Sequence, residues 1–319
     1  MDTVLVTGGA GFIGSHLVEA LVAKGKKVVV LDDLSSGSKK NLKACKNVIL
    51  VVGSITNWKL LQELFESYEF SSVFHLAAIP SVPKSVEKPI ETHNVNFDGT
   101  LFLLEVSKKF NVKKFIFASS AAVYGDNEDL PKKEDMAVNP TTPYGVDKFA
   151  SERYVVNAYR LYGLNTTALR FFNVYGERQN PSSPYSGVIS IFVDRVLSFQ
   201  RGKKTTIEIF GDGNQTRDFI YVKDVVKSIL LVSEREETAG EVYNVGTGKE
   251  TSLLDLVETL KEISGKFPNV RFLPQRKGDI KRSVADISKL KSLGFKPEVS
   301  LKEGLKRTFL YELEEKYGF

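Results

Sequence analysis

The fold of this chain is decided by residues 7–14, which read Thr7-Gly8-Gly9-Ala10-Gly11-Phe12-Ile13-Gly14. This stretch follows an apolar run at residues 3–7 that predicts a β-strand, and it opens a segment with helical patterning. Because glycine has no Cβ atom, Gly8, Gly11 and Gly14 permit a tight turn. Backbone N–H groups can then approach a pyrophosphate at the positive end of a helix dipole. This context of strand, glycine turn and helix predicts a dinucleotide site.

A carboxylate after the next expected strand, residues 27–31, indicates which dinucleotide binds. Asp32 lies at the distance from the glycines where such proteins carry a carboxylate for the hydroxyl groups of the adenosine ribose. A carboxylate there would repel the 2′-phosphate of NADP. The neighbouring residues Leu31, Asp33 and Leu34 include no arginine that could bind this phosphate. The sequence therefore favours NAD over NADP.

The first half of the chain alternates between short strand-like runs and helical patterns. We expect strands at residues 3–7, 27–31, 48–52, 72–76, 114–119 and 165–171. We expect helices from Gly14 onward and at residues 58–67, 94–110 and 144–161. Strands separated by helices indicate an α/β fold, here a Rossmann-type doubly wound parallel sheet covered on both faces.

The pattern changes after Asn173, where a loop rich in proline, serine and glycine covers residues 180–187. Beyond it we expect a helix at 188–199, a strand at 207–210, a helix at 222–233 and a strand at 241–245. We therefore place an NAD-binding Rossmann domain at residues 1–173, with a return of about residues 218–247. Residues 174–319 are expected to form mainly a smaller, mixed α/β C-terminal substrate domain.

The composition is that of an ordinary globular protein, with 319 residues, 42% of them hydrophobic and 26% charged. The net charge of +5 is spread over the chain without a basic helix or finger spacing, so we expect no nucleic acid partner. No stretch approaches the length of a membrane span. The single cysteine, Cys45, favours a reducing compartment, and we expect a cytoplasmic protein without a membrane partner or a bound metal.

The segment Pro143-Tyr144-Gly145-Val146-Asp147-Lys148 places a phenol and an ammonium group four residues apart, on one face of a predicted helix. Tyrosine has an ordinary pKa of about 10, so it is a poor base at neutral pH. A neighbouring lysine charge and an oxidised nicotinamide would both favour the phenolate. Tyr144 could then accept a proton from a hydroxyl group. In isolation, however, this spacing is more often an ordinary helix face.

Taken together, these motifs resemble the extended short-chain dehydrogenase/reductase family, and specifically its UDP-sugar 4-epimerases. The resemblance covers essentially the whole chain. Besides residues 7–14 and the Tyr144/Lys148 pair, it rests on His75-Leu76-Ala77-Ala78, Asn96-Phe97-Asp98-Gly99-Thr100, Ser119-Ser120-Ala121-Ala122-Val123-Tyr124-Gly125, Arg170-Phe171-Phe172-Asn173 and Arg217-Asp218-Phe219.

The resemblance implies NAD as the cofactor. The residues expected to bind it are Gly8, Gly11, Phe12, Ile13, Gly14, Asp32, Asp33, Ser54, Ile55, Leu76, Ala77, Ala78, Asn96, Tyr144, Lys148 and Phe172. Ser54 departs from the family pattern, which often has an aspartate against the adenine amino group. Lys148 is expected to bond the nicotinamide ribose.

The resemblance also implies a UDP-sugar substrate, with Tyr144, Lys148 and Ser120 as catalytic residues. The residues expected to bind the substrate are Ser120, Tyr144, Asn173, Val188, Phe210, Arg217, Arg276, Asp279 and Ser283. Arginine suits the diphosphate because its planar group donates paired, charge-assisted hydrogen bonds. Some epimerases of the family carry a bulky tyrosine at the position of Ser283, so a serine leaves room for an N-acetyl group.

The implied reaction is 4-epimerisation of UDP-GlcNAc/UDP-GalNAc, UDP-Glc/UDP-Gal, or both, through a 4-keto intermediate. Dehydratases and decarboxylases of the family need acidic residues beside the catalytic serine, where this chain has Ala121 and Ala122. UDP-glucuronate 4-epimerase or another nucleotide-sugar dehydratase or decarboxylase of the family remains an alternative, as does a non-catalytic NAD-sensing protein. Many members dimerise through the two helices expected at 94–110 and 144–161, so we also expect a homodimer.

Overall fold

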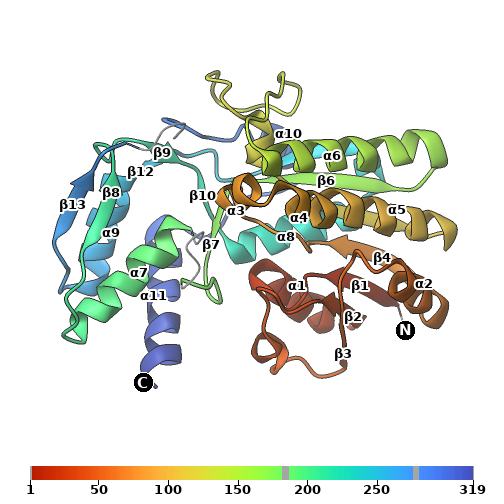
Figure 1. Ribbon diagram of the computed structural model, residues 1–319, viewed down its shortest axis with the longest axis horizontal. Helices are drawn as coiled ribbons and strands as arrows, with labels where there is room; N and C mark the ends of the chain where they lie inside the picture. The colour runs from red at the N-terminus through yellow and green to blue at the C-terminus, as the bar shows by residue number, and fades with distance from the viewer. Residues whose placement is uncertain (1, 182–186, 276–279, 319) are drawn as a thin grey trace. The chain divides into compact units, whose positions relative to one another are not determined.

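The computed structural model describes residues 2–181, 187–275 and 280–318 (Figure 1). The chain divides into two compact units. Unit 1 comprises Met1–Asn127, Glu134–Phe171 and Val226–Asn244, and unit 2 comprises Glu128–Lys133, Phe172–Val225 and Val245–Phe319. In the part of the chain that is described, no helix is long and apolar enough to cross a membrane.

A seven-stranded sheet forms the centre of unit 1, with the order β11-β6-β5-β4-β1-β2-β3. Its strands are β1 (Thr3–Thr7), β2 (Lys27–Asp32), β3 (Val48–Val52), β4 (Phe70–His75), β5 (Lys114–Ser120), β6 (Thr166–Phe171) and β11 (Glu241–Val245). The pairings from β3 to β6 are parallel. The order reverses between β1 and β4, as in doubly wound folds that bind ligands there. The Rossmann-type fold predicted from the sequence is thus confirmed.

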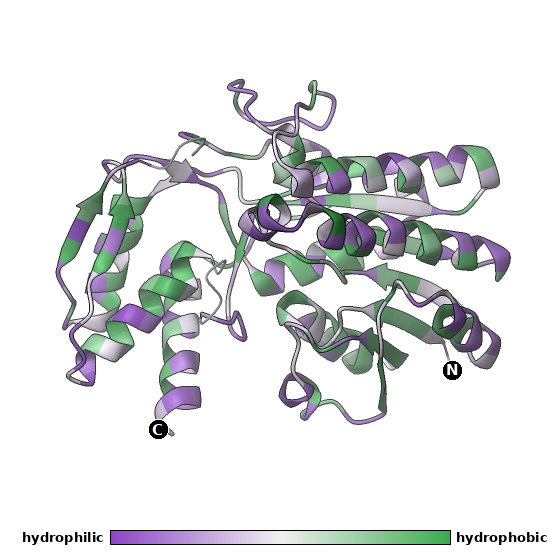
Figure 2. Ribbon diagram, viewed as in Figure 1, coloured by the Kyte–Doolittle hydropathy of each residue, from purple (hydrophilic) through white to green (hydrophobic). Residues whose placement is uncertain are grey.

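Helices cover both faces of this sheet. The helices are α1 (Phe12–Ala23), α2 (Trp58–Ser67), α3 (Val82–Glu87), α4 (Pro89–His93), α5 (Gly99–Lys109), α6 (Pro143–Tyr162) and α8 (Val222–Ser233), with short 3-10 turns at Lys39–Leu42, Ala121–Tyr124 and Glu236–Thr238. Helix α5 packs between α2 and α6, and α1 packs on β1 and β2. The strands β1, β2 and β4 are mostly hydrophobic in Figure 2. Their buried side chains, such as Leu5, Val29 and Val73, form one core with those of α2 and α5.

The helix expected at residues 94–110 is interrupted at its start. Residues Asn94–Asp98 form a π-helical turn, and the regular helix α5 follows it. The carbonyl oxygen of Asn96 accepts hydrogen bonds from the hydroxyls of Thr100 (2.7 Å) and Ser151 (3.0 Å). These bonds occupy a backbone acceptor in the turn, and such π-turns are common at functional sites.

A buried ion pair ties α6 to β6 in unit 1. Arg170 binds the Glu152 carboxylate through two nitrogens, at 3.0 and 2.7 Å, and the two side chains are 3% and 0% exposed. Ser119 donates to the same carboxylate at 2.7 Å, and Arg170 donates to the hydroxyl of Tyr124 at 2.9 Å. The network fixes the carboxyl end of β5, where Ser119 lies.

A second buried charge lies at the other end of β5. The ammonium group of Lys114 donates to the side chains of Asn165 (2.7 Å) and Thr238 (2.8 Å) and to the carbonyl of Arg235 (2.9 Å). Burial lowers the pKa of Lys114 to about 8. The segment after α8 is therefore bonded to the start of β5.

Unit 2 combines small sheets with a group of helices. Its strands are β7 (Asn173–Tyr175), β8 (Ile207–Phe210), β9 (Thr216–Arg217), β10 (Phe219–Tyr221), β12 (Thr251–Ser252) and β13 (Val270–Leu273). Its helices are α7 (Val188–Gln200), α9 (Leu253–Ser264), α10 (Ser288–Ser292) and α11 (Leu301–Tyr317), of which α7, α9 and α11 pack together. The sequence patterns had indicated α7 and β8 but neither α9 nor α11.

Asp218 holds unit 2 together at its centre. Its buried carboxylate accepts hydrogen bonds from the backbone N–H groups of Thr247 (2.8 Å), Gly248 (2.9 Å) and Ala285 (3.2 Å) and from the Thr247 hydroxyl (2.6 Å). Burial raises the pKa of Asp218, and these hydrogen bonds oppose the rise. The Asp218 side chain connects the β9–β10 region to the segments around Thr247 and Ala285, and so fixes the backbone next to Arg217.

Candidate active site

The glycine turn lies at the carboxyl end of β1, as the sequence predicted. Gly8 adopts a φ of 69°, in the left-handed region that favours glycine, and its N–H donates to the carbonyl of Leu31 at 2.9 Å. Gly11 is the N-cap of α1 and has no side chain that could accept hydrogen bonds from the first turn. The N–H groups at this helix end are therefore available to an anionic ligand.

The surroundings of the glycines fit a bound dinucleotide. A Cβ atom added to Gly14 would lie 2.1 Å from the carbonyl oxygen of Gly8, so Gly14 is required for close packing of turn and helix. A Cβ atom on Gly11 would meet only that same oxygen, at 3.2 Å. The space beside Gly11 is thus left open by the protein, and a pyrophosphate can approach the backbone there. Phe12 and Ile13, which follow in α1, are partly buried.

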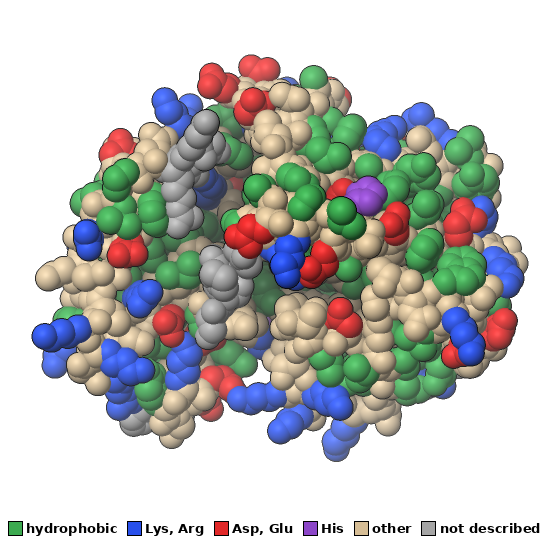
Figure 3. Space-filling view, in the orientation of Figure 1, with side chains coloured by type: hydrophobic (Ala, Val, Ile, Leu, Met, Phe, Trp, Pro, Cys, Tyr) green, Lys and Arg blue, Asp and Glu red, His purple; other side chains and the backbone are tan. Residues whose placement is uncertain are grey.

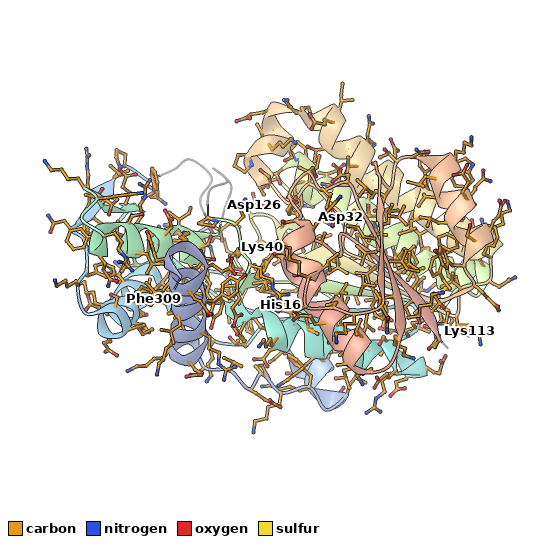
Figure 4. The ribbon with its side chains drawn as sticks, turned by 90° about the horizontal axis from the view of Figure 1, so that it is seen from below. His16, Asp32, Lys40, Lys113, Asp126 and Phe309 are labelled. Carbon is orange, nitrogen blue, oxygen red and sulfur yellow. The ribbon has the colours of Figure 1, made fainter. Side chains whose placement is uncertain are left out.

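Asp32 ends β2 beside this turn, and Figure 4 labels it together with His16 of α1. Its two carboxylate oxygens accept hydrogen bonds from the N–H groups of Ala10 (2.9 Å) and Leu34 (2.8 Å). Burial raises the pKa of Asp32, and these two bonds lower it. Each oxygen has a further lone pair, so the carboxylate can also accept a ribose hydroxyl. Asp33 is exposed and binds Ser35 instead.

Ser54 and Ile55 follow β3. The Ser54 hydroxyl forms a local turn with Thr56, with 2.8 Å between their hydroxyl oxygens. Ile55 is 3% exposed and belongs to the hydrophobic core. The packing of Ile55 against Gly99 gives it a structural role in addition to any contact with the cofactor.

Three of the expected cofactor residues follow β4. Leu76, Ala77 and Ala78 are partly buried, and the N–H of Ala77 donates to the hydroxyl of Thr7 at 3.3 Å. The side-chain amide of Asn96 binds the N–H (2.7 Å) and the carbonyl (3.2 Å) of Ile79. Asn96 therefore fixes the loop that carries the two alanines.

Ser120 and Tyr144, which the resemblance assigns to the catalytic site, lie on β5 and α6. Ser120 ends β5 and caps the following 3-10 turn, where its hydroxyl accepts a hydrogen bond from the N–H of Ala122 at 3.1 Å. Tyr144 lies in the first turn of α6, and its N–H donates to the hydroxyl of Ser85 at 3.1 Å. Burial raises the pKa of Tyr144, and the Ser120 hydroxyl opposes this. A nearby positive charge is needed to produce the phenolate at neutral pH.

Lys148 supplies a positive charge one turn further along α6. The residue is 3% exposed, and its ammonium group donates to the carbonyl of Ala118 at 2.8 Å and lies 4.9 Å from the ring centre of Phe117. Burial lowers the pKa of Lys148 to about 8, and the charge of Asp147 opposes this shift. The buried lysine, the tyrosine and the serine thus gather at the carboxyl ends of β4 and β5.

His75 is a site residue that sequence reasoning missed. Its two ring nitrogens lie 2.8 and 2.9 Å from the hydroxyls of Thr7 and Thr100, and burial lowers its pKa to about 3. The ring is therefore neutral and joins β1, β4 and α5 beneath the glycine turn. The motif at residues 75–78 contains His75, but only Leu76, Ala77 and Ala78 had been assigned a role.

The residues expected to bind UDP lie in unit 2. Arg217 donates to the carbonyls of Thr216 (2.8 Å) and Ile280 (2.7 Å), and the N–H of Ser283 donates to the same Thr216 carbonyl at 3.2 Å. Arg217 and Ser283 are thus neighbours. Asn173 is exposed, and Val188 and Phe210 are partly buried. Phe172, which was expected to bind NAD, is buried. Arg276 and Asp279 lie outside the described residues.

The fold and the glycine turn define a dinucleotide-binding α/β enzyme with a tyrosine and a lysine on one helix. The chain belongs to the NAD dependent epimerase/dehydratase family, whose model matches residues 4–246, within the extended short-chain dehydrogenases/reductases. NAD is its cofactor, in agreement with the prediction from Asp32.

Curated relatives align over nearly the full length. A UDP-glucose 4-epimerase of Mycolicibacterium smegmatis is 41% identical over 310 residues, covering 95% of this chain and 96% of the relative. A UDP-glucuronate 4-epimerase of Thermodesulfobacterium geofontis is 37% identical over 325 residues, covering 98% and 97%.

Solved structures of similar proteins have the same fold. The UDP-glucose 4-epimerase of Thermotoga maritima with UDP-glucose is 44% identical, with a TM-score of 0.92 and coverage of 98% of this chain and 99% of that chain. The UDP-N-acetylglucosamine 4-epimerase of Methanobrevibacter ruminantium, in complex with UDP-N-acetylmuramic acid, is 39% identical, with a TM-score of 0.91 and the same coverage.

Proposed function

We propose that this protein is a 4-epimerase of UDP-sugars. The observation that carries the proposal is the buried Lys148, whose ammonium group bonds Ala118 near the end of β5, one turn after Tyr144 on α6, in a chain of the NAD-dependent epimerase family. The names of similar proteins, which act on or bind several UDP-sugars, support the substrate class. Ala121 and Ala122 support epimerisation over dehydration or decarboxylation, because they offer no acid or base beside Ser120.

The three side chains divide the proton chemistry among them. Ser120 hydrogen-bonds the reacting 4-hydroxyl group and orients it toward Tyr144. The Tyr144 phenolate accepts the hydroxyl proton, and the Lys148 charge stabilises that phenolate. NAD, when bound, supplies the acceptor and then the donor of the C4 hydride. Tyr144 returns the proton to the 4-keto sugar after the sugar has turned, so C4 is inverted without net oxidation.

A matched substitution tests the role of Tyr144. Tyr144→Phe keeps the ring in its packing but removes the proton acceptor, so we expect kcat to fall by about 10²-fold or more. Binding of UDP, measured by calorimetry, should stay close to that of the unchanged protein. Turnover near the original rate in Tyr144→Phe would refute the assignment.

We propose that Ser283 admits N-acetylated sugars as well as plain hexoses. The proposal is supported by the backbone of Ser283, which bonds the same Thr216 carbonyl as Arg217, the residue expected to bind the diphosphate. Ser283→Tyr should lower kcat/KM for UDP-GlcNAc relative to UDP-Glc, with products identified by NMR. An unchanged ratio of the two kcat/KM values would contradict the proposal.

UDP-glucuronate is the second candidate substrate, and the relative of Thermodesulfobacterium geofontis is the observation that favours it. Parallel incubations with UDP-glucuronate and with UDP-Glc, UDP-Gal, UDP-GlcNAc and UDP-GalNAc, whose sugar groups are uncharged, separate these possibilities in one experiment. If none of them is epimerised and none reduces bound NAD by absorbance, the non-catalytic alternative is preferred.

We also propose a homodimer that packs through α5 and α6. Apolar side chains on these helices and on α4 are exposed, including Ile90 (77%), Tyr154 (51%) and Leu161 (69%). In Figure 3, hydrophobic side chains lie among charged ones over this part of unit 1. Sedimentation should give twice the chain mass, and Tyr154→Glu should reduce the measured mass.

A cytoplasmic location stays a prediction, favoured by the single Cys45.

A further inference from the structure

The backbone N–H groups at the start of α6 have separate hydrogen-bond partners. The N-cap of the helix is Thr142, and its hydroxyl accepts a hydrogen bond from the N–H of Gly145 at 3.2 Å. Pro143, the first helical residue, has no N–H group. The N–H of Tyr144 lies in the first turn, where a helix offers its N–H groups no backbone acceptor. It donates instead to the hydroxyl of Ser85, in the neighbouring helix α3, at 3.1 Å.

Ser85 is fixed within α3. Its side chain is fully buried, and its hydroxyl donates to the carbonyl of Val82 at 2.7 Å. Its own N–H donates to the carbonyl of Ser81, the N-cap of α3, at 3.0 Å. Because the one hydroxyl proton of Ser85 is donated to Val82, the oxygen is an acceptor toward Tyr144. The Ser85 oxygen therefore bonds the backbone of the residue that is expected to react.

A second bond holds the same face of α6 further along the helix. The hydroxyl of Ser151 donates to the carbonyl of Asn96 at 3.0 Å. Tyr144, Lys148 and Ser151 are four and three residues apart, so they share one face of α6. Ser85 and Asn96 thus hold this face on both sides of Lys148.

Both holding residues are connected to the segment that follows β4. This segment carries residues 77–78, which are expected to bind NAD. The side chain of Asn96 binds the backbone of Ile79, and the segment continues into Ser81 and α3. The position of Tyr144 is therefore linked to the part of unit 1 that is expected to receive the cofactor.

We propose that Ser85 is a positioning residue that holds the backbone of Tyr144 so that its phenol stays within reach of the reacting sugar hydroxyl. The inference deepens the proposed function and rests on the role given there to Tyr144. Proton transfer needs the two oxygens at hydrogen-bond distance, and a displacement of about 1 Å can cost up to 10²-fold in rate. The residues expected to bind UDP lie in unit 2 and make no use of this bond. Its loss should therefore lower the rate of reaction and leave binding unchanged.

The test separates turnover from binding in Ser85→Ala. We expect kcat to fall about tenfold, with KM unchanged within about twofold for the UDP-sugar that the unchanged protein turns over fastest. Reduction of NAD by this UDP-sugar in a single turnover, followed by absorbance, should slow by the same factor, because Tyr144 acts in that step. The affinities for UDP and NAD, measured by calorimetry and by fluorescence titration, should equal those of the unchanged protein.

Ser85→Cys varies the strength of the bond and carries the test if Ser85→Ala fails to fold. A thiol can occupy the place of the hydroxyl but is a weaker acceptor. The kcat of Ser85→Cys should therefore lie between those of the unchanged protein and Ser85→Ala, again with an unchanged KM.

Ser107→Ala is the matched control. Ser107 is a fully buried serine of α5 whose hydroxyl, among the described residues, bonds only within its own helix, to the carbonyl of Leu103 at 2.6 Å. The kcat of Ser107→Ala should equal that of the unchanged protein. An equal fall in this control would overturn the inference, because the effect would then come from the loss of any buried hydroxyl.

Two further outcomes distinguish this inference from the proposed function. An unchanged kcat in Ser85→Ala, or in Ser85→Cys where the alanine variant does not fold, would overturn the inference alone if Tyr144→Phe is inactive. A loss confined to KM would have the same meaning. Turnover near the original rate in Tyr144→Phe would instead overturn the proposed function.

Discussion

The buried pair of Glu152 and Arg170 allows a quantitative prediction about stability. Glu152→Gln keeps the size of the side chain but leaves the Arg170 guanidinium without its counter-charge in a site that is nearly inaccessible to water. Removing one partner of such a pair typically costs about 3–5 kcal/mol. We expect Arg170→Met to cost a similar amount, because it isolates the carboxylate, which would then keep only the bond from Ser119.

A double variant that combines Glu152→Gln with Arg170→Met separates the effect of the buried charges from the effect of side-chain shape. With both charges gone, neither buried ion remains unpaired, so the combined loss should be smaller than the sum of the two single losses by about 2–3 kcal/mol. The corresponding fall in Tm for each single variant is roughly 10 °C.

Unfolding in urea can be followed specifically in unit 1. The one tryptophan, Trp58, begins α2 and lies edge-on to Phe102 at 5.7 Å, so its fluorescence reports this unit. The measurement is made without added NAD, because a ligand of the native state would raise the apparent stability. If the losses in unfolding free energy of the two single variants add up to that of the double variant within about 0.5 kcal/mol, the reasoning is refuted. Such additivity would show no coupling between the two charges.

Three further outcomes are expected. Gly14→Ala should misfold or lose much stability because its Cβ would overlap the Gly8 carbonyl, whereas Gly11→Ala should fold normally but lose affinity for NAD, as fluorescence titration would show. Asp32→Ala should narrow the preference for NAD over NADP, measured as the ratio of their Kd values. His75 binds a proton at pH 6.5 when unfolded but only near 3 when folded, so unfolding free energy should fall with decreasing pH, by up to about 1.4 kcal/mol per unit. His75→Gln should flatten that slope in urea titrations between pH 6 and 4, and an unchanged slope would argue against a neutral His75.

Local sequence patterns were sufficient for much of unit 1. Strand β1, the glycine turn and α1 are specified within a few neighbouring residues, because the turn depends on glycines and the strand on consecutive apolar side chains. The pairing of Tyr144 with Ser120 was also expected, but from the resemblance and not from spacing. Helices α3 and α4 were missed because they are only 6 and 5 residues long, too short for a periodic pattern.

The residues that sequence reasoning missed make their contacts across long separations. Asp218 binds Ala285, and His93 binds Asp147, through side chains that carry no local signal of their partners. The π-helical turn around Asn96 likewise depends on Ser151, which lies in another helix. Such interactions are set by tertiary packing, which a single sequence does not reveal.

The bonds of Lys114 have a consequence for synthesis on the ribosome. The chain leaves unit 1 at Phe171 and re-enters it at Val226, so the partners of Lys114 beyond Asn165 emerge only after much of unit 2 has been made. Until Thr238 leaves the exit tunnel, the free-energy cost of burying this ammonium group is offset by few hydrogen bonds. Strand β5 is therefore expected to join the sheet late. The nascent amino-terminal half should stay accessible to chaperones until residues Val226–Asn244 have been made.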